Sequence, residues 1–338
     1  MPKEPAAAVT SGNGSGGAQP EQEISSEEPA AATPSEAVIE EKTAPAPPPW
    51  PVFLETAKAW DIKERVASEI ASIIKDHNLD QHCVLALFEP ENSIDSYDLD
   101  QIFSALCETN LDRSKDVLLL LLSRGGSIEA AYQISKLCKS FAKNRFVAIV
   151  PRHAKSAATL VAIGADEIHM GPLGQLGPID PQLGGLPALG VSQALKTIAS
   201  VAQEFPGSAE MFARYLRMAL TVEQIGYCDR ISESAVQYAV RLLSTKPDLK
   251  KRADAVAKEL VHEYKDHGFV IDVDEAKKHL GADWITTGTP ELVAAEAIYS
   301  HFELVNFFMR HHEPKRRILI TGGATMPDSI MIFKHRDD

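Results

Sequence analysis

The chain has 338 residues, of which 44% are hydrophobic, enough to bury the core of one large domain or two ordinary ones. It carries 34 lysines and arginines against 47 aspartates and glutamates without a basic stripe, which argues against binding to nucleic acid. No basic segment followed by an apolar run opens the chain, and no stretch reaches the roughly 18 apolar residues of a membrane span, so we expect a soluble, cytoplasmic protein.

The first 48 residues differ in composition from the rest. They contain no aromatic residue, are rich in alanine, proline and glutamate, and hold eight acidic residues against two lysines. Such a segment cannot bury enough apolar surface to offset the entropy of ordering. We therefore predict that residues 1–48 form a disordered acidic tail, ended by an extended polyproline hinge over Pro45–Pro51.

Buried strands then alternate with helices. Apolar residues at helical spacing predict a helix over Leu54–Asn78, and short apolar runs predict strands over Cys83–Phe88, Asp116–Leu122 and Phe146–Val150. Helices are predicted between and after the first two strands, over Asp98–Thr109 and Ser127–Lys143. This alternation is typical of an α/β fold with a parallel sheet, whose functional groups gather at the carboxyl ends of the strands.

The pattern becomes mostly helical beyond Pro187. Helices are predicted over Val191–Glu204, Ser208–Ala219, Ser232–Ser244, Leu249–Tyr264, Glu275–Leu280 and Glu291–Arg310. We therefore expect a domain over residues 49–305, with an α/β core at about 80–187 and a helical portion at about 188–305. Residues 306–338 are expected to form a C-terminal extension.

The turn after the second predicted strand contains two glycines. The strand ends at Leu122 and runs through Ser123-Arg124-Gly125-Gly126-Ser127 into a helix. Backbone N–H groups in such a turn can point into a cavity and stabilise a developing oxyanion. The plainer interpretation is a tight turn in which Ser127 caps the helix.

The next strand leads into a second turn with a serine. Ser156 stands at the mouth of a small-residue helix that runs to Gly164, where the helix dipole favours negative charge and the N–H of Ala157 can donate to an oxyanion. Taken alone, Ser156 is more often a helix cap. Beside the glycine turn, which should lie at the same sheet edge, it becomes a candidate nucleophile.

These two turns carry a resemblance to a known family. The stretch Val117–Gln182 resembles the Clp-type proteases and the signal peptide peptidase A group, and residues 55–305 most resemble the serine dehydrogenase proteinase family. The supporting segments are Gly164–Ile168, Gly171–Leu173, Leu176–Gln182, Gly226-Tyr227 with Arg230, Tyr238-Ala239 and His267–Asp272. The resemblance implies a Clp/crotonase-like core of repeated ββα units, Ser156 as nucleophile, and Gly125, Gly126 and Ala157 as oxyanion donors. Arg124 departs from the proline that is usual in the wider clan.

A serine hydroxyl needs a base, and the resemblance leaves this base open. Asp180 falls where Clp-type proteases hold their histidine, but an ordinary aspartate is a weak base, so it could instead orient a partner or line the groove. Lys196 matches the lysine of signal peptide peptidase relatives, and a buried lysine with a lowered pKa is a competent base.

Three further residues are alternative bases. His153 precedes Ser156 by three residues, and His267 lies in a segment shared with the family; histidine suits the pKa requirement best. Lys155 adjoins the serine but should point away from it. No cluster has the spacing of a zinc site, and the four cysteines lie far apart, so we predict no metal, no cofactor and free thiols.

The predicted activity is that of an ATP-independent serine peptidase that forms an acyl-enzyme on Ser156. Its partners would be a peptide or unfolded protein substrate and, from the resemblance, further copies of itself. Two alternatives are a non-catalytic scaffold that binds peptides, with the tail as docking segment, and a crotonase-type acyl-CoA enzyme. The helix-opening serine weighs against the latter.

Overall fold

The computed structural model describes residues 47–183 and 186–334. The predicted disordered tail lies outside these residues except for its last two positions. The described residues from Pro48 onward form one compact unit. In the part of the chain that is described, no helix is both long and apolar enough to cross a lipid bilayer.

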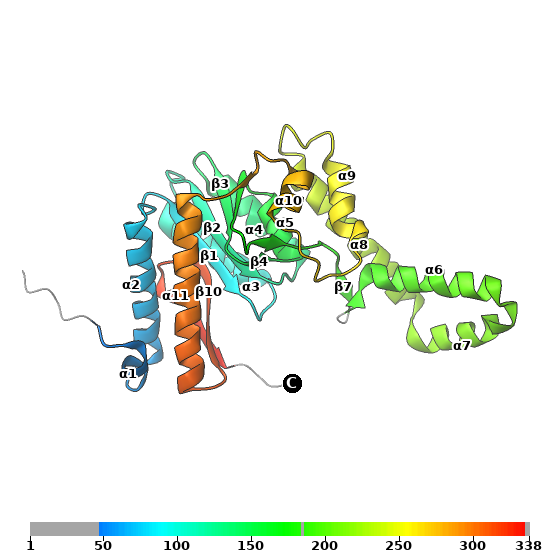
Figure 1. The fold of residues 1–338 in the computed structure, drawn as a ribbon, viewed down its shortest axis with the longest axis horizontal. Helices are drawn as coiled ribbons and strands as arrows, with labels where there is room; N and C mark the ends of the chain where they lie inside the picture. The colour runs from blue at the N-terminus through cyan, green and yellow to red at the C-terminus, as the bar shows by residue number, and fades with distance from the viewer. Residues whose placement is uncertain (1–46, 184–185, 335–338) are drawn as a thin grey trace, which may run out of the picture. The chain divides into compact units, whose positions relative to one another are not determined.

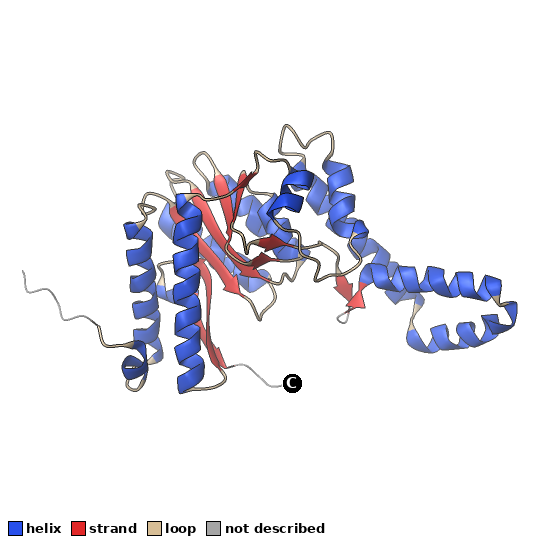
Figure 2. Ribbon diagram, viewed as in Figure 1, coloured by secondary structure: helices blue, strands red, loops and turns tan. Residues whose placement is uncertain are grey.

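A nine-stranded sheet forms the centre of this unit (Figure 2). Five parallel strands make up most of it: β1 (Cys83–Glu89), β2 (Val117–Ser123), β3 (Phe146–Val150), β5 (Glu167–Met170) and β9 (Ile285–Thr286). Two antiparallel strands, β10 (Arg316–Gly323) and β11 (Ile330–Lys334), extend it beyond β1. The short strand β4 (His153–Ala154) pairs with the end of β2 and with β6 (Gln175–Leu176). The predicted α/β class with a mostly parallel sheet is thus confirmed.

Both faces of the sheet are covered, which explains the unbroken apolar run of β2. Alternate residues point to opposite faces of a strand, so Leu118, Leu120 and Leu122 enter one core cluster. Their neighbours Val117, Leu119 and Leu121 enter the other. On the first face lie α1 (Trp50–Leu54), α2 (Ala59–Asp76) and α11 (Pro290–His312), and on the second α3 (Ser96–Asn110), α4 (Ile128–Phe141) and α5 (Ala157–Ile163) (Figure 1).

The remaining helices include an arm that leaves the sheet. The hairpin of β7 (Gln182–Leu183) and β8 (Leu186–Pro187) leads into α6 (Ala188–Glu204), a 3₁₀ turn (Pro206–Ser208), α7 (Ala209–Ala219) and the long α8 (Val222–Leu243). In Figure 1, α6 and α7 extend away from the sheet, and α8 returns to it. The chain continues through α9 (Ala253–Lys258), a π-helical turn (Glu259–Glu263) and α10 (Val273–Leu280).

Two predictions near the start of the domain are corrected. Trp50 does not lie in an extended hinge but in α1, where it is buried in the core. The helix predicted over Leu54–Asn78 begins later, as α2 at Ala59, because Leu54 ends α1 and a turn separates the two helices. Trp60, one of the apolar residues in that stretch, is exposed. Burial of the Trp50 ring, on which the Arg65 guanidinium stacks at 4.2 Å, outweighs the polyproline preference of the preceding residues.

The predicted C-terminal boundary is also corrected. Residue 305 lies inside α11, and β10 pairs with β1 in the main sheet, so the expected extension supplies core strands. These strands cover the edge that β1 would otherwise expose, where unpaired N–H and C=O groups would remain. The pairing joins segments more than 200 residues apart in sequence, which local patterns do not reveal.

Candidate active site

Ser156 adopts a backbone conformation that is rare for a residue with a side chain. Its φ is 51° and its ψ is −120°, and its hydroxyl makes no capping bond to α5. Ser127, by contrast, is a true cap, because its Oγ accepts the N–H of Ala130 at 3.1 Å. Residues held in strained backbone regions gather at functional sites. The structure thus separates two serines that capping statistics alone treat alike.

The glycine turn packs directly against this serine. A Cβ atom on Gly125, whose φ is +110°, would lie 2.7 Å from the Cβ of Ser156 and 2.9 Å from the nitrogen of Ala157. A Cβ on Gly126 would lie 2.3 Å from the carbonyl oxygen of Ile94. Only glycine fits at either position, and the two predicted turns do meet at one edge of the sheet.

Two N–H groups at this edge remain available to a ligand. Neither the Gly126 N–H nor the Ala157 N–H donates to an acceptor within the described part of the chain. Gly125 differs from the prediction, because its N–H already donates to the Ser123 hydroxyl at 3.1 Å. It therefore shapes the turn and is not itself an oxyanion donor.

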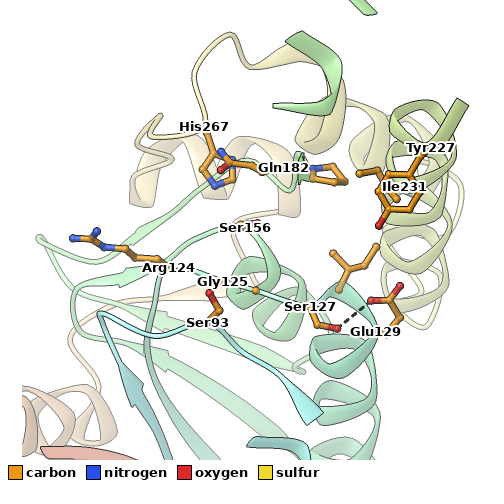
Figure 3. A pocket seen from close by; sticks show the side chains of 13 residues that line it. Ser93, Arg124, Gly125, Ser127, Glu129, Ser156, Gln182, Tyr227, Ile231 and His267 are labelled. Atoms are coloured by element: carbon orange, nitrogen blue, oxygen red, sulfur yellow. Dashed lines mark hydrogen bonds between the residues drawn. The ribbon is translucent and has the colours of Figure 1, made fainter. Parts of the chain in front are cut away.

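A histidine and an aspartate form a tight pair beside the serine. The His267 Nδ1 lies 2.5 Å from the Asp180 Oδ1, and the aspartate side chain is only 7% exposed while the histidine side chain is 27% exposed. A carboxylate on Nδ1 makes this nitrogen the donor and leaves Nε2 as the proton acceptor. In Figure 3 the His267 ring points into the cavity toward Ser156. The pair unites two of the predicted candidates.

Hydrogen bonds to the backbone bring this pair together. The buried Thr159 hydroxyl accepts the N–H of Gly177 at 3.0 Å, which ties the segment before Asp180 to the helix that begins after Ser156. Leu176 and Ile271 exchange two backbone hydrogen bonds of 2.9 and 3.1 Å, which ties the same segment to the loop that carries His267. Asp180 and His267 are 87 positions apart in the sequence, and the segment between them includes the whole helical arm.

Ser156 and His267 line one cavity of about 510 Å³ (Figure 3). The glycine turn forms its floor, and α8 forms one wall with Tyr227 and Ile231. Arg124 and Glu129 also line it, so the cavity offers an apolar wall together with one basic and one acidic side chain. Such a mixture of apolar walls and a few polar groups is typical of a site that binds an organic ligand.

The other proposed bases do not face this cavity. The Lys155 ammonium donates to the carbonyl oxygens of Leu176 at 3.0 Å and Phe269 at 2.8 Å, and burial lowers its pKa to about 8. It therefore holds the loop that carries His267. His153 lies on β4, where burial and the charge of Arg124 lower its pKa to about 4, and its Nε2 is buried without a partner among the described residues.

Lys196 is also separated from Ser156. It lies exposed on α6 and lines a second cavity of about 590 Å³, which Asp180 also lines. The prediction that Lys196 serves the serine is therefore not supported by its position. The sequence interval from the serine was suitable, but α6, which contains Lys196, extends away from the sheet in Figure 1.

Sequence reasoning assigned no role to several residues of the cavity. Ser93, Ile128 and Ile231 line it, and Tyr227 had entered only as part of a family segment. Tyr227 and Ile231 are four residues apart on α8, a spacing that places both on one helix face. Periodicity could identify that face, but not the cavity that it covers.

No group of three or more histidine, cysteine, aspartate and glutamate side chains that could hold a metal ion occurs within residues 47–183 and 186–334. The four cysteines are free thiols, of which Cys83, Cys138 and Cys228 are buried. Burial raises the pKa of the Cys83 thiol, which favours its unreactive protonated form.

Two solved protease structures are similar to part of the chain. A mutant of the 1510-N membrane-bound stomatin-specific protease, in complex with a substrate peptide, is 18% identical; the match covers 64% of this chain and 80% of that one, with a TM-score of 0.40. ClpP1 from Listeria monocytogenes is 13% identical over 66% of this chain and 98% of that one, with a TM-score of 0.38.

Two proteins of Methanocaldococcus jannaschii resemble the chain in sequence. The uncharacterized protein MJ0137 is 32% identical over 54% of the chain and 57% of its own length, and the uncharacterized protein MJ1495 is 35% identical over 29% and 32%. The chain thus spans little more than half of one relative and a third of the other. A family model matches residues 62–320, and the chain belongs to this family, the ClpP-like SDH-type serine proteinases.

Proposed function

We propose that the protein is a serine peptidase in which Ser156, His267 and Asp180 act as a catalytic triad. The observation that carries this proposal is the His267–Asp180 pair, which has its carboxylate buried and its histidine on the cavity of Ser156. Asp180 would fix the tautomer and stabilise the imidazolium as it forms. Membership in a serine proteinase family supports the same conclusion.

In the first half-reaction, the Ser156 Oγ attacks the carbonyl carbon of a peptide bond and gives its proton to the Nε2 of His267. The N–H groups of Gly126 and Ala157 hold the oxygen that becomes negative. The intermediate then collapses: the C–N bond breaks, His267 passes its proton to the leaving amine, and an acyl-enzyme remains on Ser156.

In the second half-reaction, His267 takes a proton from water as the water oxygen attacks the acyl carbon. The ester bond to the Ser156 Oγ then breaks, His267 returns the proton to that oxygen, and the carboxylic acid leaves. Each step needs only groups at the sheet edge and water, so the proposed reaction uses no nucleotide. The backbone strain at Ser156 supports this role, because it projects the hydroxyl from the turn without a capping bond. The proton transfer from Ser156 to His267 runs through a catalytic hydrogen bond, and such bonds commonly shorten only when substrate binds.

A labelling experiment tests the nucleophile and the base together. The wild-type protein is treated with a fluorophosphonate probe and assayed, without nucleotide, on casein and on a fluorogenic peptide. We expect Ser156→Ala and His267→Ala to abolish labelling and cleavage, and Lys196→Ala to retain both within about twofold, because Lys196 faces another cavity.

Equal labelling of the wild type and Ser156→Ala would overturn the nucleophile. Loss of labelling in Lys196→Ala, with His267→Ala still active, would instead favour a serine-lysine pair over the triad. Melting temperatures of all variants distinguish a chemical effect from misfolding.

We also propose that copies of the chain associate through the helical arm. Met211, Tyr215 and Met218 lie at positions i, i+4 and i+7 of α7, which places them on one helix face, and they are 60%, 65% and 89% exposed. An exposed apolar face on a projecting helix is typical of an interaction surface. This surface fits the homo-oligomer expected from the sequence.

A further inference from the structure

Ser123 connects the two turns that form the site. It ends β2, is fully buried, and its carbonyl oxygen accepts the N–H of Lys155, the residue before Ser156, at 3.0 Å. Its hydroxyl oxygen accepts the N–H of Gly125 at 3.1 Å. One residue thus holds both the serine turn and the glycine turn, although it does not line the cavity.

A buried carboxyl group controls the orientation of the Ser123 hydroxyl. Glu89 ends β1 as the register partner of Ser123, is 2% exposed, and its Oε1 accepts the hydroxyl hydrogen of Ser123 at 3.2 Å. A hydroxyl has one hydrogen to donate. Because Glu89 takes this hydrogen, a lone pair of Ser123 is directed to the N–H of Gly125.

The surroundings of Glu89 decide its charge. Two acidic side chains face it, Asp98 on α3, which is 3% exposed, and Asp95 at the cap of that helix, while Ser123 faces it from β2. On β10, the buried Thr321 hydroxyl faces Asp98. Burial and the charge of Asp98 raise the pKa of Glu89 to about 8, so Glu89 is protonated at neutral pH and hydrogen-bonds to Asp98.

We propose that Glu89 and Ser123 are positioning residues, which hold the Gly125 turn so that the neighbouring Gly126 N–H meets the oxyanion of the reaction. The proposal rests on the peptidase function proposed above. Neither residue touches the substrate. Their effect passes through backbone geometry, and a displacement of about 1 Å at a reacting group costs about a hundredfold in rate.

We call the hydrogen bonds that run from Asp98 through Glu89 and Ser123 to the Gly125 N–H the relay. The relay depends on pH because the proton of Glu89 forms its bond to Asp98. Glu89 is neutral below its folded pKa, and its ionisation above about pH 8 places a second carboxylate beside Asp98. Ionisation removes the proton through which Glu89 bonds to Asp98, and repulsion then displaces the Glu89 carboxylate from Asp98. The Ser123 hydroxyl bonds the charged form of Glu89 more strongly, so it follows the displaced carboxylate. The arrangement present at neutral pH is therefore lost as the pH rises through about 8.

The experiment compares Ser123→Ala and Glu89→Gln with the wild type by kcat and KM between pH 6 and 10. Ser135→Ala is the matched control, because Ser135 is equally buried and its hydroxyl donates to the Val161 carbonyl away from the cavity. We expect Ser123→Ala to lower kcat by about a hundredfold with KM unchanged. Glu89→Gln keeps an acceptor for Ser123 and a donor for Asp98, so it should retain kcat at pH 7. Because glutamine does not ionise, kcat of this variant should not decline above pH 8 as kcat of the wild type does.

Wild-type kcat in Ser123→Ala, or an unchanged alkaline decline in Glu89→Gln, would overturn the relay while the peptidase function stands. If Ser123→Ala does not fold, the pH profile of Glu89→Gln decides. If the wild type neither labels nor cleaves, the proposed function fails, and hydrogen exchange of residues 124–128 tests the relay by itself. Faster exchange in Ser123→Ala than in Ser135→Ala supports it, and equal exchange overturns it.

Discussion

The substitution Asp180→Asn tests the triad at its least exposed member. Asparagine has nearly the same shape as aspartate, so the cavity should remain intact while the negative charge beside His267 disappears. When Ser156 attacks, His267 becomes positively charged at a nitrogen 2.5 Å from the Asp180 oxygen. The substitution therefore removes an ion pair that exists only after proton transfer, and its cost should fall on kcat.

The magnitude follows from the separation and burial of the pair. Two charges about 4 Å apart at an effective dielectric constant of about 20 interact by about 4 kcal/mol. At about 1.4 kcal/mol per factor of ten, this is roughly a thousandfold in kcat. An amide in place of the carboxylate also permits the wrong imidazole tautomer, which acts in the same direction.

The assay is steady-state cleavage of a fluorogenic peptide, with the melting temperature as a check on folding. Asp229→Asn is the matched control: this exposed aspartate lines the same second cavity as Asp180, but its Oδ1 accepts from Ser192 at 2.9 Å. We expect the control to stay within about twofold of the wild type. If Asp180→Asn kept kcat within about threefold while His267→Ala abolished cleavage, the role of Asp180 in the triad would be refuted.

Two further predictions concern the glycine turn and the arm. Gly125→Ala should cost about 1 to 3 kcal/mol of stability, because its φ of +110° is strained for alanine and its Cβ would meet Ser156 and Ala157. It should also lower kcat about a hundredfold. Gly207→Ala is the control: its Cβ would meet nothing within 4 Å, so it should change neither stability nor kcat. Equal effects of the two substitutions would contradict the packing argument. Met218 is 89% exposed, so Met218→Glu should leave the melting temperature unchanged. It should lower the molar mass of the assembly measured by light scattering. An unchanged molar mass would argue against assembly through the arm.

Local patterns in the sequence determined the first three parallel strands, most helices and the two turns at the sheet edge. The apolar run of β2 and the glycine pair can be recognised without a structure, because burial on both faces and close backbone approach each demand particular residue types. Ser156 followed from its place in that pattern. Its strained backbone and missing cap bond add a physical reason that capping statistics alone did not contain.

The partner of the serine was decided only by the tertiary structure. His267 and Asp180 were separate candidates, and no spacing rule joins residues that the whole helical arm separates. The bridge between Leu176 and Ile271 closes that arm and sets the histidine over the cavity, while the same arm carries Lys196 to another one. The sequence alone therefore determined the chemistry at the sheet edge, because strand ends and turns are local. The choice of base depended on long-range backbone pairing, which leaves no periodic pattern in a single sequence.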